Sequence, residues 1–599
     1  MPTPIFKSKW LAIAVLGIIV LLGALVRFQD LTEKTIAHIE IYVPGIQLPS
    51  GLSDPNPRLG LRDTLIGVMV DGEPHPPAYY IFMLGWTRLF GAGILSLRLP
   101  SVLLGIASIL LIAWLGLLER DKWTGILAAG MFAFNGHQVF WSQTAKMYSM
   151  GCFLGILSTL LLLLAFRRQS WQRAVQVAYL VVTLAGLTTV VYFWLLFFTH
   201  ILWVLARTIA KRNAAPGLLR WQFLAWILAS PLLSLAIFQS HRESYLSPNP
   251  LQDLVDYLQF GFLFEPDFFA LAPQTWLAVA TLVLLPVGLA LLVLGLWAWG
   301  RNVETEEAVA VAVPWPLTVF AGLLAFVAIL RLAQFTRGLD ASRTGWVVAS
   351  SLVPLLLVVI DLLLRRYWNH IQNMGGGAIV RGALDRVRNS PSILLAILPV
   401  AALGAVAPMM PLLASRTAML FTPYLLLVVA WGVLSLLRRH RVWAALLPAL
   451  AVIFWFSIVY YRDSAIEHPT DYKGLAEQWI PQIGDSDLVF LQRHWATTPI
   501  FYYLKGDRYH FIASNYGEAV QEGPTARIWV LTPTGLPDPP EMVQALKGYD
   551  AQKTLEALRI KATLYTAPGH GSTATGHAFG GADGSFHVDS AFSALLYAR

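Results

Sequence analysis

Residues 97–118, LRLPSVLLGIASILLIAWLGLL, decide the fold class of this chain. Arg98 is the one charged side chain in this stretch, and it stands near the start. An apolar run of about 20 residues has the length that crosses the hydrocarbon core of a bilayer as a helix. Such runs recur throughout the first 461 residues, and the pair within 174–209 can also be interpreted as one long segment. We predict about thirteen transmembrane helices, near residues 10–28, 97–118, 123–141, 148–166, 174–191, 193–209, 219–239, 276–300, 315–333, 346–364, 391–412, 417–437 and 442–461.

The composition of the whole chain agrees with this interpretation. Only 13% of the 599 residues are charged and 56% are hydrophobic, whereas a soluble globular protein is usually about 25% charged. The single cysteine excludes an internal disulfide framework, and 22 Trp, 31 Phe and 20 Tyr are too many aromatic residues for a disordered chain. What remains is a polytopic α-helical membrane protein, with the lipid bilayer as its first expected partner.

The basic residues of the first 461 positions gather in alternate gaps between the apolar runs. Lys7 and Lys9 precede the first run, and five arginines lie between residues 365 and 388. Positively charged loops mark the cytoplasmic side of a membrane. We therefore predict a multi-pass membrane protein with a cytoplasmic N-terminus and an extracytoplasmic C-terminal domain. The net charge of +8 is thus a topology signal and does not indicate nucleic-acid binding.

The sequence pattern changes near Arg462, which divides the chain into two predicted domains. Residues 1–461 form the transmembrane core, and its first external loop (29–97) includes an interfacial helix over 76–92 with Tyr79, Tyr80 and Trp86 as interfacial aromatics. Residues 462–599 alternate short strands with helices, which predicts a small doubly wound α/β domain outside the cytoplasm. The predicted strands are 487–492, 509–513 and 527–533, and the predicted helices are 471–484, 497–506, 539–549 and 551–559.

Acidic residues of the first external loop are candidates for catalysis. Glu40 stands between apolar residues that would hold it against the membrane surface. Asp71, Glu73 and His75 follow in the run DGEPHPPAYY, where the Pro-Pro pair restricts the backbone. A solvated loop charge is the ordinary explanation for such an acid, but long loops in compact proteins are usually functional.

Cations at the outer ends of the spans are candidates for anion binding. Lys146 lies in the second external gap with Gln143 and Tyr148, and Arg343 and Arg416 lie in later external gaps. A cation at a helix end is often only an anchor, but the outer side should be poor in positive charge. Cations beside carboxylates at membrane level indicate a site for an anionic lipid headgroup together with a general base.

No histidine of the chain has a ligand spacing that indicates a metal site. The Gly-rich stretch over 568–585 lacks the strand and helix that would flank a dinucleotide-binding loop. We therefore predict no cofactor; a divalent metal stays open, although the sequence does not indicate one.

Three motifs in order resemble a known enzyme family. They are DGEPHPPAYYIFMLGWTRLFG (71–91), LRLPSVLLG (97–105) and FWSQTAKMYSM (140–150). The series is similar to the bacterial branch of the protein-O-mannosyltransferase-like glycosyltransferases. This resemblance implies the C-type glycosyltransferase fold and an enzyme that takes a sugar from a polyprenyl-phosphate carrier at the outer face of the membrane.

The resemblance also implies roles for individual residues. Glu40 stands where the family has a first-loop acid that serves as catalytic base, and Lys146 and Arg416 stand at phosphate-contacting positions. The chain departs from the family pattern at Ile39 and Thr144, each of which replaces an acid. Asp71 or Glu73 could compensate, or the site could be altered or inactive.

The expected chemistry is an inverting sugar transfer to an acceptor hydroxyl. A positioned carboxylate takes the proton of the hydroxyl, and fixed cations stabilise the charge that grows on the leaving lipid phosphate. The acceptor is extracytoplasmic, and it could be a protein, a lipid or a glycan.

Two alternative functions stay open. One is a transporter or flippase of lipid-linked sugars, which should carry charges in mid-span and internal repeats. The other is a non-catalytic relative of the family.

Overall fold

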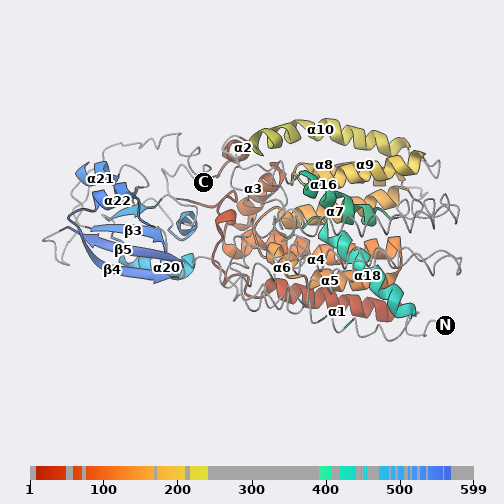
Figure 1. Cartoon of the computed structure of the whole chain (residues 1–599), viewed down its shortest axis with the longest axis horizontal. Coiled ribbons are helices and arrows are strands. Elements are labelled where there is room, and N and C mark those ends of the chain that lie inside the picture. Colours follow the sequence, from red (N-terminus) through yellow and green to blue (C-terminus); the bar gives the residue numbers. More distant parts are fainter. Residues whose placement is uncertain are drawn as a thin grey trace, which may run out of the picture.

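The computed structural model of the chain describes two regions that lie end to end (Figure 1). The helical region comprises residues 9–48, 58–69, 76–166, 172–209, 216–240, 390–406 and 419–439, with the single residues 447, 451 and 454. The α/β region comprises residues 471–484, 487–492, 497–504, 510–512, 516–522, 527–534, 537–557 and 559–567. The spans predicted near 276–300, 315–333 and 346–364 lie outside the described residues, as does the Gly-rich stretch over 568–585.

The helical region is a bundle of apolar helices. Three of its described helices are long and apolar enough to cross a membrane, namely α1, α4 and α7. The helices of this region are α1 (Lys9–Phe28), α2 (Leu61–Met69), α3 (Ala78–Phe90), α4 (Ile94–Glu119), α5 (Lys122–Ala133), α6 (Gly136–Ser142), α7 (Tyr148–Ala165), α8 (Gln172–Leu187), α9 (Phe193–Ile209), α10 (Pro216–Ser240), α16 (Pro391–Val406) and α18 (Thr422–Arg439), with the 3-10 helix η2 (His38–Glu40).

The helix bounds correct one of the predicted spans and decide another that was left open. The stretch 123–141 is not one helix, because α5 ends at Ala133 and α6 begins at Gly136. The Asn135 side chain accepts a hydrogen bond from the backbone N–H of Gln138 (3.0 Å) and so caps α6. The stretch 174–209 forms two helices, α8 and α9, as the two predicted spans 174–191 and 193–209 expect, and a turn over residues 188–192 separates them.

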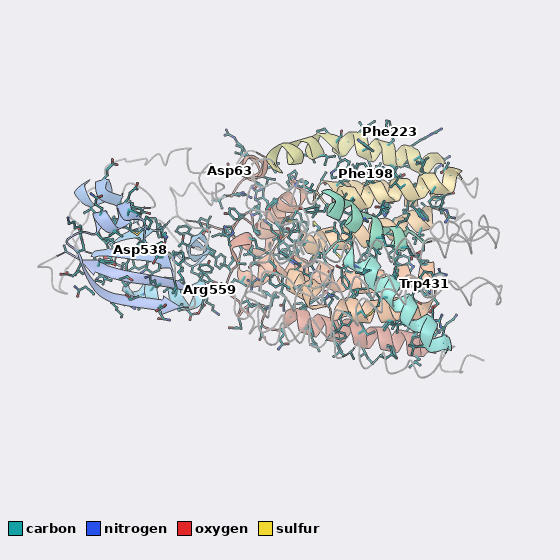
Figure 2. All side chains as sticks on the ribbon, in the orientation of Figure 1. Asp63, Phe198, Phe223, Trp431, Asp538 and Arg559 are labelled. Carbon is teal, nitrogen blue, oxygen red and sulfur yellow. The ribbon has the colours of Figure 1, made fainter. Side chains whose placement is uncertain are left out.

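Large apolar side chains cover the outer surface of the bundle. Phe223 on α10 points away from the other helices (Figure 2) and is 65% exposed. Trp10 and Ile13 on α1 are exposed as well. A soluble protein rarely exposes contiguous apolar patches of this kind, whereas helices that face lipid do so because the hydrocarbon core of the bilayer is itself apolar.

Helix α3 forms within the stretch predicted as an interfacial helix, but two of its aromatic residues are placed differently from the prediction. Tyr79 and Tyr80 are buried in the apolar core of the bundle and do not face the membrane interface. Only Trp86 of the three is half-buried. Its Nε1 donates to the Ser96 carbonyl oxygen (2.9 Å). Pro100 has no N–H to give that carbonyl, so Trp86 replaces the missing helical hydrogen bond.

The α/β region is built on a five-stranded sheet with the strand order β2-β1-β3-β5-β4. Strands β1, β2 and β3 are parallel, whereas β5 is antiparallel to both β3 and β4. Its elements are α20 (Tyr472–Trp479), η6 (Ile480–Gln482), β1 (Leu488–Leu491), η7 (Thr498–Tyr502), β2 (His510–Ile512), α21 (Tyr516–Glu522), β3 (Arg527–Pro533), α22 (Pro540–Ala545), β4 (Asp550–Ala557) and β5 (Ile560–Thr566). The domain is therefore mixed and not doubly wound throughout.

The predicted helix over 551–559 is wrong, since residues 551–557 belong to strand β4 and a turn precedes β5. Arg559 lies in this turn (Figure 2) with a positive φ of 62°, and the chain returns at once as β5. Along β4 only Leu555 is buried. An exposed edge strand shows little alternation of hydrophobic and polar residues. The spacing of the apolar residues over 551–559 therefore resembled that of a helix, whereas pairing with β5 decides that the segment is a strand.

The first loop of the helical region is packed against the α/β region. Ile41 belongs to the same apolar core as Trp479 and Phe501, and Tyr42 and Leu48 lie against that core. The loop therefore contacts the helical bundle on one side and the α/β domain on the other, which positions the site described next.

Candidate functional site

A buried ion pair joins the first loop to helix α4. Arg98 Nε donates to Glu40 Oε1 (3.0 Å), and Arg98 Nη2 donates to Glu40 Oε2 (2.7 Å). Both side chains are 2% exposed. Planar guanidinium and carboxylate groups that bond at two points fix each other's orientation as well as their separation.

The remaining donors of Arg98 hold the backbone of the first loop. Nη1 donates to the carbonyl oxygens of Leu31 (2.8 Å) and Lys34 (3.1 Å), and Nη2 also donates to that of Thr35 (2.8 Å). A buried arginine is tolerated only when its charge and its donors are satisfied. Arg98 meets both conditions, and the loop from Leu31 to Glu40 wraps around it.

Two backbone amides complete the environment of Glu40. Its Oε2 accepts from the N–H of Ala37 (2.9 Å), and its Oε1 accepts from the N–H of Ala145 (2.7 Å). Burial raises the pKa of this carboxyl, but the Arg98 guanidinium and the two amides lower it by more, so the pKa lies below its ordinary value. Glu40 is therefore ionised at neutral pH, and its oxygens are already occupied by four hydrogen bonds.

The amide of Ala145 brings the second predicted part of the site to Glu40. Lys146, the next residue, is buried, and its Nζ donates to the Tyr80 hydroxyl (3.1 Å). This short turn between α6 and α7 thus binds the Glu40 carboxylate through the Ala145 amide and carries the Lys146 ammonium group on the next residue. The arrangement can hold an anion near the ammonium while the Glu40–Arg98 pair keeps the surrounding backbone in place.

Gln143 ties the same turn to the end of α1. Its Nε2 donates to the carbonyl oxygens of Val26, Arg27 and Gln29, and its Oε1 accepts from Lys34 Nζ. Gln143 is thus a structural connector between α1 and the turn. Tyr148 is buried at the start of α7, with its ring 4.4 Å from that of Trp141.

The structure brings together three of the predicted site residues, Glu40, Gln143 and Lys146, and it places Tyr148 at the end of their turn. The other predicted site residues lie outside the described residues: Asp71, Glu73, His75, Arg343 and Arg416. The predicted role of Glu40 as catalytic base stays a prediction. Its four hydrogen bonds and lowered pKa favour a positioning role over proton transfer.

Two arginines of this region were not predicted to contribute to the site. Arg98 was included in the RLPS motif without a role, although a charge at the start of an apolar span is a signal for function. Arg58 is buried beside Tyr42 and Tyr80, with its Cζ 5.6 Å from each ring centre. The sequence offered little reason to select Arg58, because it follows a Pro-rich loop segment in which a charged residue is usually solvated.

Among the residues that the structure describes, no group of three or more His, Cys, Asp or Glu side chains could hold a metal ion.

Comparison with known proteins finds no matching family model and no matching curated protein sequence. Among solved structures, the chain is similar to the oligosaccharyltransferase of Archaeoglobus fulgidus in complex with zinc and sulfate, at 13% identity and a TM-score of 0.41, over 89% of this chain and 71% of that one. ArnT from Cupriavidus metallidurans in the apo state has 12% identity and a TM-score of 0.44, over 92% of this chain and 98% of that one. The arabinofuranosyltransferase AftD from Mycobacteria has 12% identity and a TM-score of 0.43, over 94% of this chain and 40% of that one.

Proposed function

We propose that the chain is a membrane glycosyltransferase that moves a sugar from a polyprenyl-phosphate carrier to an extracytoplasmic acceptor hydroxyl, with inversion at the anomeric carbon. The observation that supports this most directly is the turn at Ala145 and Lys146, which is bonded to Glu40 on one side and to Tyr80 on the other. It presents a fixed cation at the end of apolar helices, where the phosphate of a membrane-embedded lipid would lie.

In this proposal Lys146 contacts the donor phosphate, with Arg343 and Arg416 as further contacts. Negative charge grows on that phosphate as the bond to the sugar breaks, and a cation fixed in a water-poor site stabilises it without reorganisation. Gln143 keeps the turn against α1, and Tyr148, Glu73 and His75 are the remaining candidates for contact with substrate.

The general base is a carboxylate of the first external loop. Glu40 and Asp71 are the two candidates. A base needs a free lone pair and a pKa that is not depressed, and Glu40 has its oxygens in four hydrogen bonds and a lowered pKa. We therefore assign proton transfer to Asp71 and the support of the surrounding backbone to Glu40.

The test uses full-length protein in lipid nanodiscs with a panel of radiolabelled polyprenyl-phosphate sugars. We expect release of polyprenyl phosphate by transfer or by slow hydrolysis, and Asp71→Asn should abolish it with the donor still bound. If the wild-type protein cleaves no donor, the proposal is wrong. Movement of intact lipid-linked sugar across proteoliposomes without cleavage would instead support a transporter.

The membrane orientation belongs to the same proposal. The basic gaps place the N-terminus in the cytoplasm and the α/β domain outside the bacterial inner membrane. Figure 1 shows that α1 begins at the end of the bundle far from the α/β domain. Reporter fusions after residue 599 should be active only for a periplasmic reporter.

A further inference from the structure

The α/β domain forms hydrogen bonds with the loop that surrounds Arg98. Tyr503 is the residue that follows η7. Its hydroxyl oxygen accepts from the backbone N–H of Ile36 (3.0 Å), and the hydroxyl forms a second hydrogen bond with the Thr35 hydroxyl (3.2 Å). The Thr35 hydroxyl oxygen also accepts from the N–H of Lys473 (3.3 Å). These contacts join residues more than 400 positions apart, so they exist only in the folded chain.

Two further contacts belong to the same interface. Lys473 Nζ lies 3.4 Å from the Glu33 carboxylate, and the Tyr502 hydroxyl donates to the carbonyl oxygen of Ala92 (3.1 Å), just before α4. The first of these pairs is largely solvent-exposed and contributes little to stability. The contact through Tyr503 is partly buried and is bonded directly to the loop that surrounds Arg98, so it is the contact that can position this loop.

A continuous series of hydrogen bonds runs from Tyr503 to the candidate site. Tyr503 holds Thr35 and Ile36, and the carbonyl oxygen of Thr35 accepts from Arg98 (2.8 Å). Arg98 binds both oxygens of Glu40, and Glu40 accepts from the amide that precedes Lys146. Tyr503, Arg98 and Glu40 each have at least two hydrogen bonds in this series, as does Thr35 through its hydroxyl and its carbonyl oxygen, so the series connects Tyr503 with the Ala145 amide without a gap.

We infer that Tyr503 is a positioning residue of the glycosyl-transfer site, through which the α/β domain sets the place of Glu40 and of the turn that carries Lys146. This inference rests on the proposed function for its catalytic consequence. It assigns to the α/β domain a role in the reaction itself, beyond any role that its surface has toward the acceptor. Apolar packing of Ile41 in the core of the domain keeps the two regions together while the hydroxyl of Tyr503 sets the position.

The kinetic test compares Tyr503→Phe with Tyr565→Phe in full-length protein in nanodiscs. Tyr503→Phe removes only the hydroxyl and keeps the ring. Tyr565 lies on β5 of the same domain, packed against another core, and is the matched control. We expect Tyr503→Phe to lower kcat about tenfold, as the loss of about two hydrogen bonds allows. The donor KM should change less than about twofold, because the substitution leaves the hydrogen bond from Lys146 Nζ to the Tyr80 hydroxyl in place. The control should keep the wild-type kcat.

A second arm measures position without catalysis. Hydrogen exchange of the segment 31–40 should be faster in Tyr503→Phe than in wild type and unchanged in Tyr565→Phe. In a double-mutant cycle, Thr35→Val combined with Tyr503→Phe should lower kcat by less than the product of the single effects, because the two hydroxyls bond each other.

The inference is overturned if Tyr503→Phe keeps kcat, or if kcat falls equally in both variants. It is also overturned if exchange in 31–40 does not change. A wild-type protein that cleaves no donor overturns the proposed function instead, and the hydrogen-exchange arm then decides by itself whether Tyr503 positions the loop.

Discussion

Arg98 on α4 and Glu40 in the first loop are bonded at two points, with Nε–Oε1 at 3.0 Å and Nη2–Oε2 at 2.7 Å, and both side chains are buried. A single guanidinium thus neutralises the carboxylate and also binds three loop carbonyl oxygens. The pair holds the loop against the helical bundle, and the first two of the four predictions below concern this pair.

Replacing Arg98 with methionine should strongly destabilise the protein. The change leaves the Glu40 charge buried without its partner and three carbonyl oxygens without their donor, and breaking a buried pair in this way costs about 3–5 kcal/mol. Thermal unfolding in detergent, followed by fluorescence-detected size exclusion, measures the effect. Arg88→Met is the control, since Arg88 is exposed and makes one long hydrogen bond of 3.4 Å to Leu59. Equal midpoints for the two variants would contradict the prediction.

The Glu40 carboxylate should make stability fall in acid. Its pKa in the folded protein lies below the ordinary value of 4.5, so the folded state prefers the ionised form. The stabilisation is complete above that ordinary pKa and is lost as the pH falls below it, through the pKa of the folded state. Glu40→Gln cannot titrate, so its unfolding midpoint should depend less on pH between about 5 and 3 than that of the wild type. If the unfolding midpoints of Glu40→Gln and the wild type change with pH in parallel, Glu40 is not the group whose protonation lowers the stability.

The close approach of α4 and α5 should not tolerate a side chain. A Cβ added to Gly116 would lie 2.4 Å from the Cα of Gly125, and backbone atoms cannot move aside as side chains do. We expect Gly116→Ala to lower the unfolding free energy by about 1–3 kcal/mol. Gly85→Ala on α3 is the matched control, because its Cβ would meet nothing within 4 Å and alanine favours a helix. The prediction fails if both variants unfold at the same temperature.

Lys146 should matter for the reaction through its charge. With Lys146→Met we expect kcat/KM for the donor to fall by about 10²–10³, the usual effect of removing one donor to a developing negative charge, while Lys146→Arg should keep more activity because it keeps the cation. Lys122→Met changes a lysine at the start of α5 and should keep the wild-type rate. Steady-state release of polyprenyl phosphate gives all three values, and an active Lys146→Met would exclude the phosphate contact.

Long apolar runs were sufficient to predict the main helices. The runs at 10–28, 97–118 and 148–166 correspond closely to α1, α4 and α7, because the apolar length alone requires a helix in lipid. The break at Asn135 and the strand β4 were missed. A cap inside an apolar run and an exposed edge strand leave little hydrophobic periodicity, and in both cases a local hydrogen bond or a neighbouring strand decided the conformation.

For the site, the sequence by itself determined which polar residues stand out: Glu40 among apolar neighbours, and Lys146 at the outer end of a span. Only the tertiary structure decided what these groups do to one another. Arg98 lies 58 positions from Glu40, and Tyr503 lies 467 positions from Ile36. Residue types are local properties that can be read along a chain, whereas the pairing of a buried charge depends on which distant segments the packing of apolar surface brings within hydrogen-bond distance.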